Sequence, residues 1–338
     1  MNLSSRIQCI HFALLLSILL ASCVDNLPPT KDPSVSPTLT ATPTQTVFYL
    51  GSTALSYGIF ETDAVSLTVD VYNTTPDGLN ASADISIEDP SGMKTYKLQT
   101  GESTIVHAMP DGKKQVTITS GGQAKRNGEI RGVFIDTITF DGSAVQIEEP
   151  YQRLVVYGDS LAAGGSVDHP SAEAWPVLLR RHYSVMVESY GYRSLYDDAS
   201  TSAKRAELVS KISAWTPDFI WLAIGTNDHT FGQWSAQDFG NSYVGTLDAI
   251  HLSNPQAVVF AQSPILQENE SANSFGDDLE SYRQQIAAAC LVRAAWCIFV
   301  DGKDPAFPQP DELDKDGVHL TTESSAKYAE AVLNIISK

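Results

Sequence analysis

Four short blocks in the C-terminal half of the chain hold the side chains that nucleophilic catalysis needs. They are Gly158-Asp159-Ser160-Leu161, Glu188-Ser189-Tyr190-Gly191, Ile224-Gly225-Thr226-Asn227-Asp228 and Asp316-Gly317-Val318-His319-Leu320. A serine hydroxyl attacks an ester only when a neutral imidazole removes its proton, and the imidazolium then needs a carboxylate partner. The spacing from Asp316 to His319 fits one short turn in which the carboxylate bonds the imidazole. Together these residue types indicate hydrolysis of an acyl ester through an acyl-enzyme.

The same blocks offer donors for the negative charge that develops on the ester carbonyl oxygen, where one preplaced donor contributes roughly 3 kcal/mol. Gly191 lets a backbone N–H approach a ligand closely, and Asn227 contributes a side-chain amide. Taken singly, Gly191 is typical of a turn, Asn227 of a helix cap and His319 of a packed core. Asp316 alone is typical of a solvated acidic loop. Their occurrence together favours a catalytic site.

Two other histidines compete for the role of the base. His182 follows Arg180 and Arg181 at the end of a predicted helix, and the acid nearest to His229 is Asp228. Neither pattern places a carboxylate as Asp316 is placed before His319, so His319 is the preferred base.

The elements that must position these blocks form an alternating pattern from Arg153 onward. Apolar runs typical of buried strands occur at 154–157, 185–187, 219–222, 257–260 and 297–300. Helical patterns separate or follow them at 173–182, 203–214, 242–252, 278–294 and 324–336. Five buried strands alternating with helices predict a parallel, doubly wound α/β sheet. Sites in such sheets lie beyond the carboxyl ends of the strands, where the four blocks fall.

The blocks, in this order, resemble those of the SGNH (GDSL-type) hydrolases over residues 154–338. The resemblance implies a flavodoxin-like catalytic domain with Ser160 as nucleophile, His319 as general base and Asp316 as the residue that orients His319. It also implies an oxyanion hole made by the N–H groups of Ser160 and Gly191 and the amide of Asn227.

Residues 47–148 have a different pattern, with alternating apolar and polar residues and frequent turns. Strand-like stretches occur at 65–71, 83–88, 94–99, 116–119 and 133–140. They predict an antiparallel, jelly-roll-like β-sandwich ahead of the catalytic domain at 149–338. This order resembles the two-domain bacterial acetyl xylan esterases, which implies an acetylated polysaccharide or oligosaccharide substrate. Aromatic residues near the site are candidates for sugar stacking: Tyr157, Trp175, Tyr190, Tyr192 and Trp234.

The N-terminus has the pattern of an export signal. Arg6 precedes an apolar run that ends in Leu20-Ala21-Ser22-Cys23, which resembles a bacterial lipobox. We expect residues 1–22 to be removed, Cys23 to be lipidated and the Pro/Thr-rich segment 23–46 to act as a linker. These features predict an exported lipoprotein that is membrane-anchored through its lipid and faces outside the cytoplasm.

Composition limits the remaining classes. The 338 residues carry a formal net charge of −18, which disfavours nucleic-acid partners. The histidines and cysteines form no clustered ligand set, so we expect neither a metal nor a cofactor. Cys290 and Cys297 fit either a disulfide or two buried thiols. Two alternatives to a carbohydrate esterase remain: an esterase acting on acyl lipids or peptidoglycan O-acetyl groups, and a non-catalytic glycan-binding lipoprotein.

Overall fold

The computed structural model describes residues 45–48, 55–75, 83–126, 129–148 and 150–338. The predicted signal peptide, Cys23 and nearly all of the predicted linker lie outside these ranges. Among the described residues, no helix is both long and apolar enough to cross a membrane.

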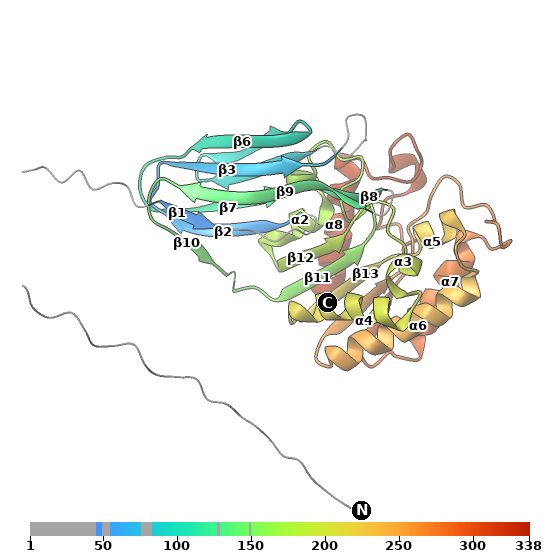
Figure 1. Ribbon diagram of the computed structural model, residues 1–338. Coiled ribbons are helices and arrows are strands. Elements are labelled where there is room, and N and C mark those ends of the chain that lie inside the picture. The colour runs from blue at the N-terminus through green and yellow to red at the C-terminus, as the bar shows by residue number, and fades with distance from the viewer. Residues whose placement is uncertain (1–44, 49–54, 76–82, 127–128, 149) are drawn as a thin grey trace, which may run out of the picture. The chain divides into compact units, whose positions relative to one another are not determined.

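The first ten strands form two antiparallel sheets (Figure 1). One sheet has the order β1-β9-β3-β6, with β8 paired to β9, and contains β1 (Thr46–Phe48), β3 (Ser66–Asn73), β6 (Gly101–Ala108), β8 (Gln123–Arg126) and β9 (Glu129–Phe140). The other has the order β10-β2-β7-β4-β5 and contains β2 (Tyr57–Thr62), β4 (Asp84–Asp89), β5 (Gly92–Lys97), β7 (Lys114–Ser120) and β10 (Ala144–Ile147).

The core of this sandwich is made by every second residue of its strands. Leu67, Val69 and Val71 of β3 are buried with Ile85 and Ile87 of β4. This is the pattern expected when one face of each sheet is covered by the other sheet. The predicted β-sandwich is therefore correct, although β1, β2, β6, β8 and β10 were not predicted from the sequence.

The catalytic half is a five-stranded parallel sheet of order β12-β11-β13-β14-β15, as the flavodoxin-like prediction requires. Its strands are β11 (Arg153–Gly158), β12 (Ser184–Ser189), β13 (Phe219–Ala223), β14 (Val258–Gln262) and β15 (Cys297–Val300). The helices are α1 (Pro170–Glu173), α2 (Trp175–Leu178), α3 (Leu195–Ala199), α4 (Ser202–Ala214), α5 (Thr226–Phe231), α6 (Ala236–Ser253), α7 (Leu279–Leu291) and α8 (Thr322–Ile336), with short 3₁₀ turns at Leu179–Arg181 and Pro310–Glu312.

Each face of the parallel sheet has its own core. Leu154 and Val156 pack with Trp175 of α2 and Tyr328 of α8, whereas Val155 belongs to the core formed with α4, α6 and α7. Burial on both faces explains why these strands read as continuous apolar runs.

The helix predicted over 173–182 is wrong as a single element. It is broken at Ala174, whose backbone is extended, and continues as α2 and a 3₁₀ turn. Pro176 explains the break because it has no N–H to donate to the preceding turn.

Cys290, in α7, and Cys297, the first residue of β15, are joined by a disulfide. The bond ties the end of this helix to the start of the adjoining strand.

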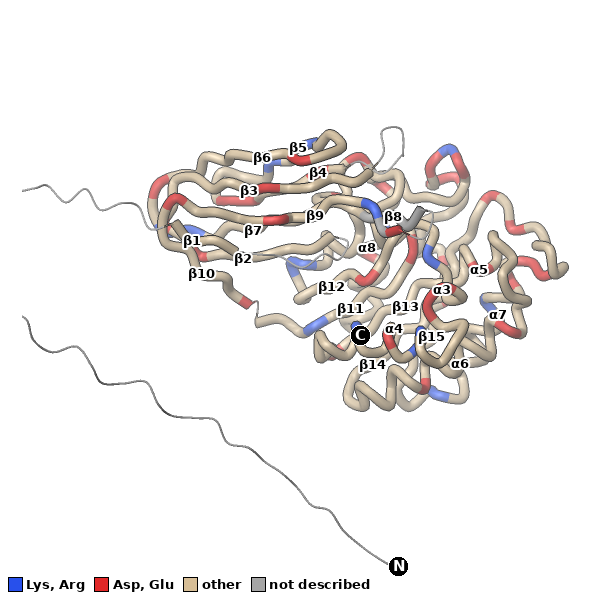
Figure 2. Tube along the Cα trace, viewed as in Figure 1, with Lys and Arg blue, Asp and Glu red and all other residues tan. Residues whose placement is uncertain are grey.

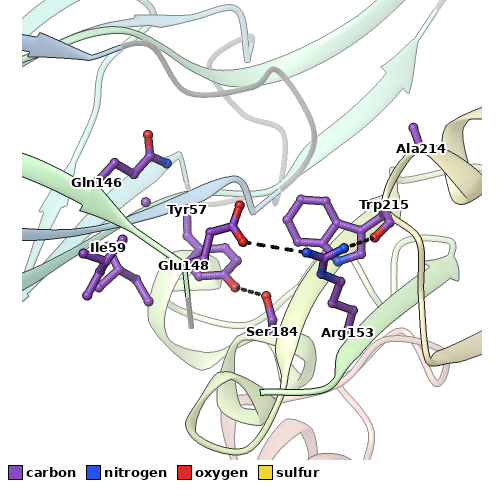
Figure 3. A pocket seen from close by; sticks show the side chains of 10 residues that line it. Tyr57, Ile59, Gln146, Glu148, Arg153, Ser184, Ala214 and Trp215 are labelled. Carbon is purple, nitrogen blue, oxygen red and sulfur yellow. Dashed lines mark hydrogen bonds and ion pairs between the residues drawn. The ribbon is translucent and has the colours of Figure 1, made fainter. Parts of the chain in front are cut away.

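A cavity of about 340 Å³ lies where the sandwich meets the amino ends of β11 and β12 (Figure 3). Tyr57 approaches Ser184 with 3.2 Å between hydroxyl oxygens, and Arg153 pairs with Glu148 at 3.7 Å. Because the catalytic blocks follow the opposite ends of these strands, this cavity is not the catalytic site.

Candidate active site

Ser160 lies in the turn that follows β11. The Asp159 carboxylate accepts the Leu161 N–H at 3.0 Å, and the Gly165 N–H donates to the Ser160 carbonyl at 2.7 Å. These bonds curl the chain sharply after the strand and leave the serine half-buried at the sheet edge. A Cβ on Gly165 would lie 3.0 Å from Cδ2 of His319, so a side chain there would press on the imidazole.

His319 joins Ser160 to Asp316. Its Nε2 lies 2.8 Å from Ser160 Oγ, and its Nδ1 lies 2.6 Å from Asp316 Oδ2. Asp316 Oδ1 also accepts the backbone N–H groups of Val318 and His319, at 3.0 Å each. The structure therefore connects the three predicted catalytic residues in one hydrogen-bonded chain.

Partial burial raises the pKa of Asp316, but the hydrogen bonds from His319 and Val318 outweigh burial and hold that pKa below its ordinary value. Asp316 is therefore a carboxylate at neutral pH.

Gly317 allows this loop to form. Its φ is +69°, and a Cβ there would lie 2.5 Å from Cβ of Glu268. Both the backbone conformation and the close contact require glycine between Asp316 and His319.

The predicted oxyanion residues lie beside Ser160, with Gly191 in the segment after β12 and Asn227 at the start of α5. Gly158 of β11 is in register with Ser189 of β12 and with Ala223 of β13, so the Gly191 and Asn227 segments flank the Ser160 turn. The Asn227 amide donates through Nδ2 to the Arg193 carbonyl at 2.8 Å, which joins the start of α5 to the segment that follows Gly191. The register therefore places Ser160 and the predicted oxyanion residues at the carboxyl edge of the sheet.

Arg193 anchors the Gly191 loop, a role that sequence analysis missed. The guanidinium is buried, lies over the rings of Tyr157 and Tyr190, and pairs with Glu188 at 2.9 Å and with Asp198 at 2.5 Å. A buried charge is retained only where it is paired, so this network fixes the loop firmly. The acids that flank Arg193 in sequence were the available indication.

The competing histidines lie elsewhere. His182 is exposed at the amino end of β12, on the edge opposite Ser160. His229 is buried, with Nε2 3.1 Å from the Ser271 carbonyl oxygen, and burial lowers its pKa. Neither contacts Ser160.

The aromatic candidates divide by exposure. Tyr157, Trp175 and Tyr190 are buried in cores or against Arg193, which makes sugar stacking by their faces wrong for these three. Trp234 is half-buried against Tyr196. Tyr192 is 52% exposed.

Asp159 gives the first testable prediction. Burial raises its pKa to about 6, although the Leu161 N–H lowers it. A carboxyl whose folded-state pKa is raised stabilises the fold at pH values below its unfolded pKa, and this stability is lost as the pH rises through about 6. We expect Asp159→Asn, which stays neutral, to remove a decrease of about 2 kcal/mol in unfolding free energy between pH 4 and 7.

The measurement is denaturant unfolding of both proteins across this pH range. Asp168→Asn, a change at an exposed aspartate in the following loop, is the control and should keep the wild-type slope. A constant difference between wild type and Asp159→Asn at every pH would contradict the prediction.

Within the described part of the chain, no group of three or more His, Cys, Asp or Glu residues is arranged to hold a metal ion.

A parallel sheet of order 2-1-3-4-5 with serine, histidine, carboxylate and amide groups at its carboxyl edge defines the SGNH class of hydrolases. Residues 156–327, about half of the chain, match the GDSL-like Lipase/Acylhydrolase family, and the chain belongs to this family of carboxylic ester hydrolases.

Solved structures with the same two-part fold include three that illustrate its range. A salicylyl-acyltransferase from a tetracycline biosynthetic pathway is 17% identical with a TM-score of 0.64, over 83% of this chain and 82% of that chain. A family two carbohydrate esterase from Cellvibrio japonicus is 17% identical with a TM-score of 0.61, over 86% and 90%. One from Clostridium thermocellum, in complex with cellohexaose, is 14% identical with a TM-score of 0.62, over 86% and 98%. The TM-scores show a shared fold, and identities this low show nothing beyond it. No curated protein sequence matches the chain.

Proposed function

We propose that the protein is an exported, surface-anchored serine esterase that removes acetyl groups from carbohydrate. The observation that supports catalysis is the unbroken chain from Ser160 Oγ through the imidazole of His319 to the Asp316 carboxylate. The structural likeness to carbohydrate esterases supports the substrate class.

In the proposed reaction, Ser160 Oγ bonds to the acetyl carbon while its proton passes to Nε2 of His319. The negative charge on the carbonyl oxygen is stabilised by the N–H groups of Ser160 and Gly191 and by the Asn227 amide. Collapse of this intermediate breaks the bond to the sugar oxygen, which takes the proton from His319. Water then attacks the acetyl-enzyme by the same route, releasing acetate and restoring Ser160.

An exposed aromatic pair beside the catalytic loops supports a sugar ligand. Tyr192, next to Gly191, and Phe231, one helical turn after Asn227, are 52% and 47% exposed, with ring centroids 6.2 Å apart. Tyr192 has φ of +68°, a costly conformation for a tyrosine that persists where its surroundings hold it. Its neighbours Gly191 and Arg193 are buried, which supplies that restraint.

The acidic surface of the protein also supports a neutral polysaccharide as the substrate. Acidic positions are spread over both the sandwich and the catalytic domain (Figure 2), and the net charge is −18. An acetylated neutral glycan suffers no repulsion from this surface, whereas anionic polymers do.

The function is tested by release of acetate from acetylated xylan, acetylated glucomannan and O-acetylated peptidoglycan, and by release of fatty acid from a long-chain acyl lipid, with Ser160→Ala as the inactive control. We expect release from at least one plant-type glycan to exceed release from the other two substrates. Preference for peptidoglycan or lipid would show that the proposed substrate class is wrong. No hydrolysis of any of these esters would indicate a glycan-binding protein without catalytic activity.

Tyr192→Ala tests the aromatic pair. Loss of one ring face should raise KM for an acetylated oligosaccharide roughly fivefold, since a stacked ring contributes about 1 kcal/mol. Turnover of 4-nitrophenyl acetate should not change. Tyr151→Ala is the matched control because Tyr151 is similarly exposed but precedes β11 at the opposite edge. Equal KM values for the two variants would contradict a role for Tyr192 in sugar binding.

The proposed anchoring rests on Cys23 and the lipobox-like residues before it. We expect Cys23→Ala to move the protein from the membrane fraction to the soluble fraction without changing its specific activity, because the lipid supplies only attachment. Cell fractionation with an activity assay measures both quantities. Retention of the variant on the membrane would overturn the lipoprotein proposal.

A further inference from the structure

The β-sandwich touches the loop that carries the nucleophile. Gly122, just after β7, lies so close to this loop that a Cβ there would stand 2.4 Å from the Ala163 carbonyl oxygen. Ala163 follows Ser160 by three residues, and its N–H donates to the Asp159 carbonyl at 3.0 Å. Backbone from the sandwich therefore packs directly against the Ser160 turn.

Asp84, the first residue of β4, makes polar contacts with the catalytic domain near this loop. Its side chain is fully buried, with Oδ1 accepting the Ser171 N–H at 3.2 Å and Oδ2 lying 3.3 Å from Nδ1 of His169. Ser86, on the same strand, bonds the Ser171 hydroxyl at 2.7 Å. A buried carboxylate is costly without such partners, and here the catalytic domain supplies them.

The same loop is tied on its other side to the helix that follows His319. Oε2 of Glu173 accepts both the His169 N–H and the Thr322 hydroxyl, each at 2.9 Å. Thr322, the first residue of α8, also accepts the Asp168 N–H at 3.3 Å. The loop is thus held between the sandwich and the start of α8.

From this arrangement we propose that the sandwich helps to hold the active site in its catalytic geometry. Asp84 is then a positioning residue that keeps Ser160 within hydrogen-bonding distance of His319. Asp84 acts through His169 and Ser171 and touches neither the substrate nor the reacting atoms. The proposal depends on the ester hydrolysis of the family and is independent of which acyl substrate is used.

The chain contains a matched control on the same strand. Asp89, the last residue of β4, is also buried and pairs with a histidine, His107, at 3.0 Å, but this pair lies within the sandwich. Loss of Asp89 leaves the buried His107 without its carboxylate partner. Loss of Asp84 leaves the buried Ser171 N–H without its acceptor. Only loss of Asp84 should disturb the Ser160 turn.

The experiment compares Asp84→Ala and Asp89→Ala in the full chain, using 4-nitrophenyl acetate below the unfolding temperature of both variants. We expect Asp84→Ala to lower kcat about tenfold to a hundredfold, the range expected for a misplaced catalytic group, with KM within twofold. Labelling of Ser160 by an alkyl fluorophosphonate should slow by a similar factor. Asp89→Ala should keep kcat within twofold even though its unfolding temperature also falls.

Ser86→Ala provides the test should Asp84→Ala not fold, since it removes one hydroxyl. We expect it to lower kcat about threefold without a change in KM. Wild-type kcat and labelling rate in whichever of these two variants folds, or equal kcat losses in Asp84→Ala and Asp89→Ala, would overturn the proposal. A wild-type protein that is inactive on 4-nitrophenyl acetate but is labelled at Ser160 would contradict the proposed function alone, and the labelling rates would still decide the role of Asp84.

Discussion

Replacement of Ser160 by alanine is expected to lower kcat for ester hydrolysis by about 10⁴-fold or more, with no loss of folded protein. Alanine keeps the Cβ and the backbone N–H, so the turn after β11 and one oxyanion donor survive. What disappears is the oxygen that lies 2.8 Å from Nε2 of His319 and would bond to the acyl carbon. Without it the covalent route is closed.

The measurement is turnover of 4-nitrophenyl acetate and of an acetylated glycan, beside circular dichroism of both proteins. Ser263→Ala is the control, because Ser263 follows β14 at the same edge of the sheet and bonds the Gly302 N–H instead of a histidine. The control should retain turnover within about threefold. Near wild-type turnover in Ser160→Ala would show that the nucleophile is a different residue.

The sequence predicted the catalytic domain well because its information is local and periodic. Runs such as 154–157 and 219–222 are apolar because both faces of the sheet are covered, and each lies inside an observed strand. The motif residues follow these strands directly, so the strand order alone brings Ser160, Gly191 and Asn227 to one edge. The turn from Asp316 to His319 is local as well.

Features that depend on contacts between residues far apart along the chain could not be predicted from the sequence. Nothing near Asp84 in the chain indicates that it bonds Ser171, 87 residues away. The acids on either side of Arg193 in sequence hint at its ion pairs, but its burial over the rings of Tyr157 and Tyr190 arises only in the fold. The aromatic candidates show the same limit, because sequence position does not reveal which rings are buried in the core. Tyr192 stays exposed, whereas Trp175 stacks on Tyr328.

A second large decrease in kcat is expected for Asp316→Asn. The Asp316 carboxylate accepts Nδ1–H of His319 at 2.6 Å, which leaves Nε2 free to take the Ser160 proton. An asparagine amide can instead donate to Nδ1 and place the imidazole hydrogen on Nε2, where it blocks proton transfer. We expect kcat to fall about 10³-fold, within the range known for a mis-set tautomer.

The pH profile distinguishes this role from a surface role. Burial raises the pKa of Asp316, but hydrogen bonds from His319 and Val318 outweigh it and hold the pKa below its ordinary value, so the carboxylate is charged at neutral pH. Its charge stabilises the imidazolium, and the rate rises with pH as the imidazole loses its proton. Removing the charge should therefore move the acidic limb of kcat/KM to lower pH while the plateau falls.

Asp311→Asn is the matched control for this shift. Asp311 is an exposed acid in the same acidic loop, five residues before Asp316, and the change removes the same charge at a greater distance from the imidazole. The control should leave both the plateau and the limb of the profile in place. If Asp316→Asn and Asp311→Asn gave the same profile as wild type, the site would be a Ser160–His319 dyad, and the contact between Asp316 and the imidazole would serve only to fold the loop.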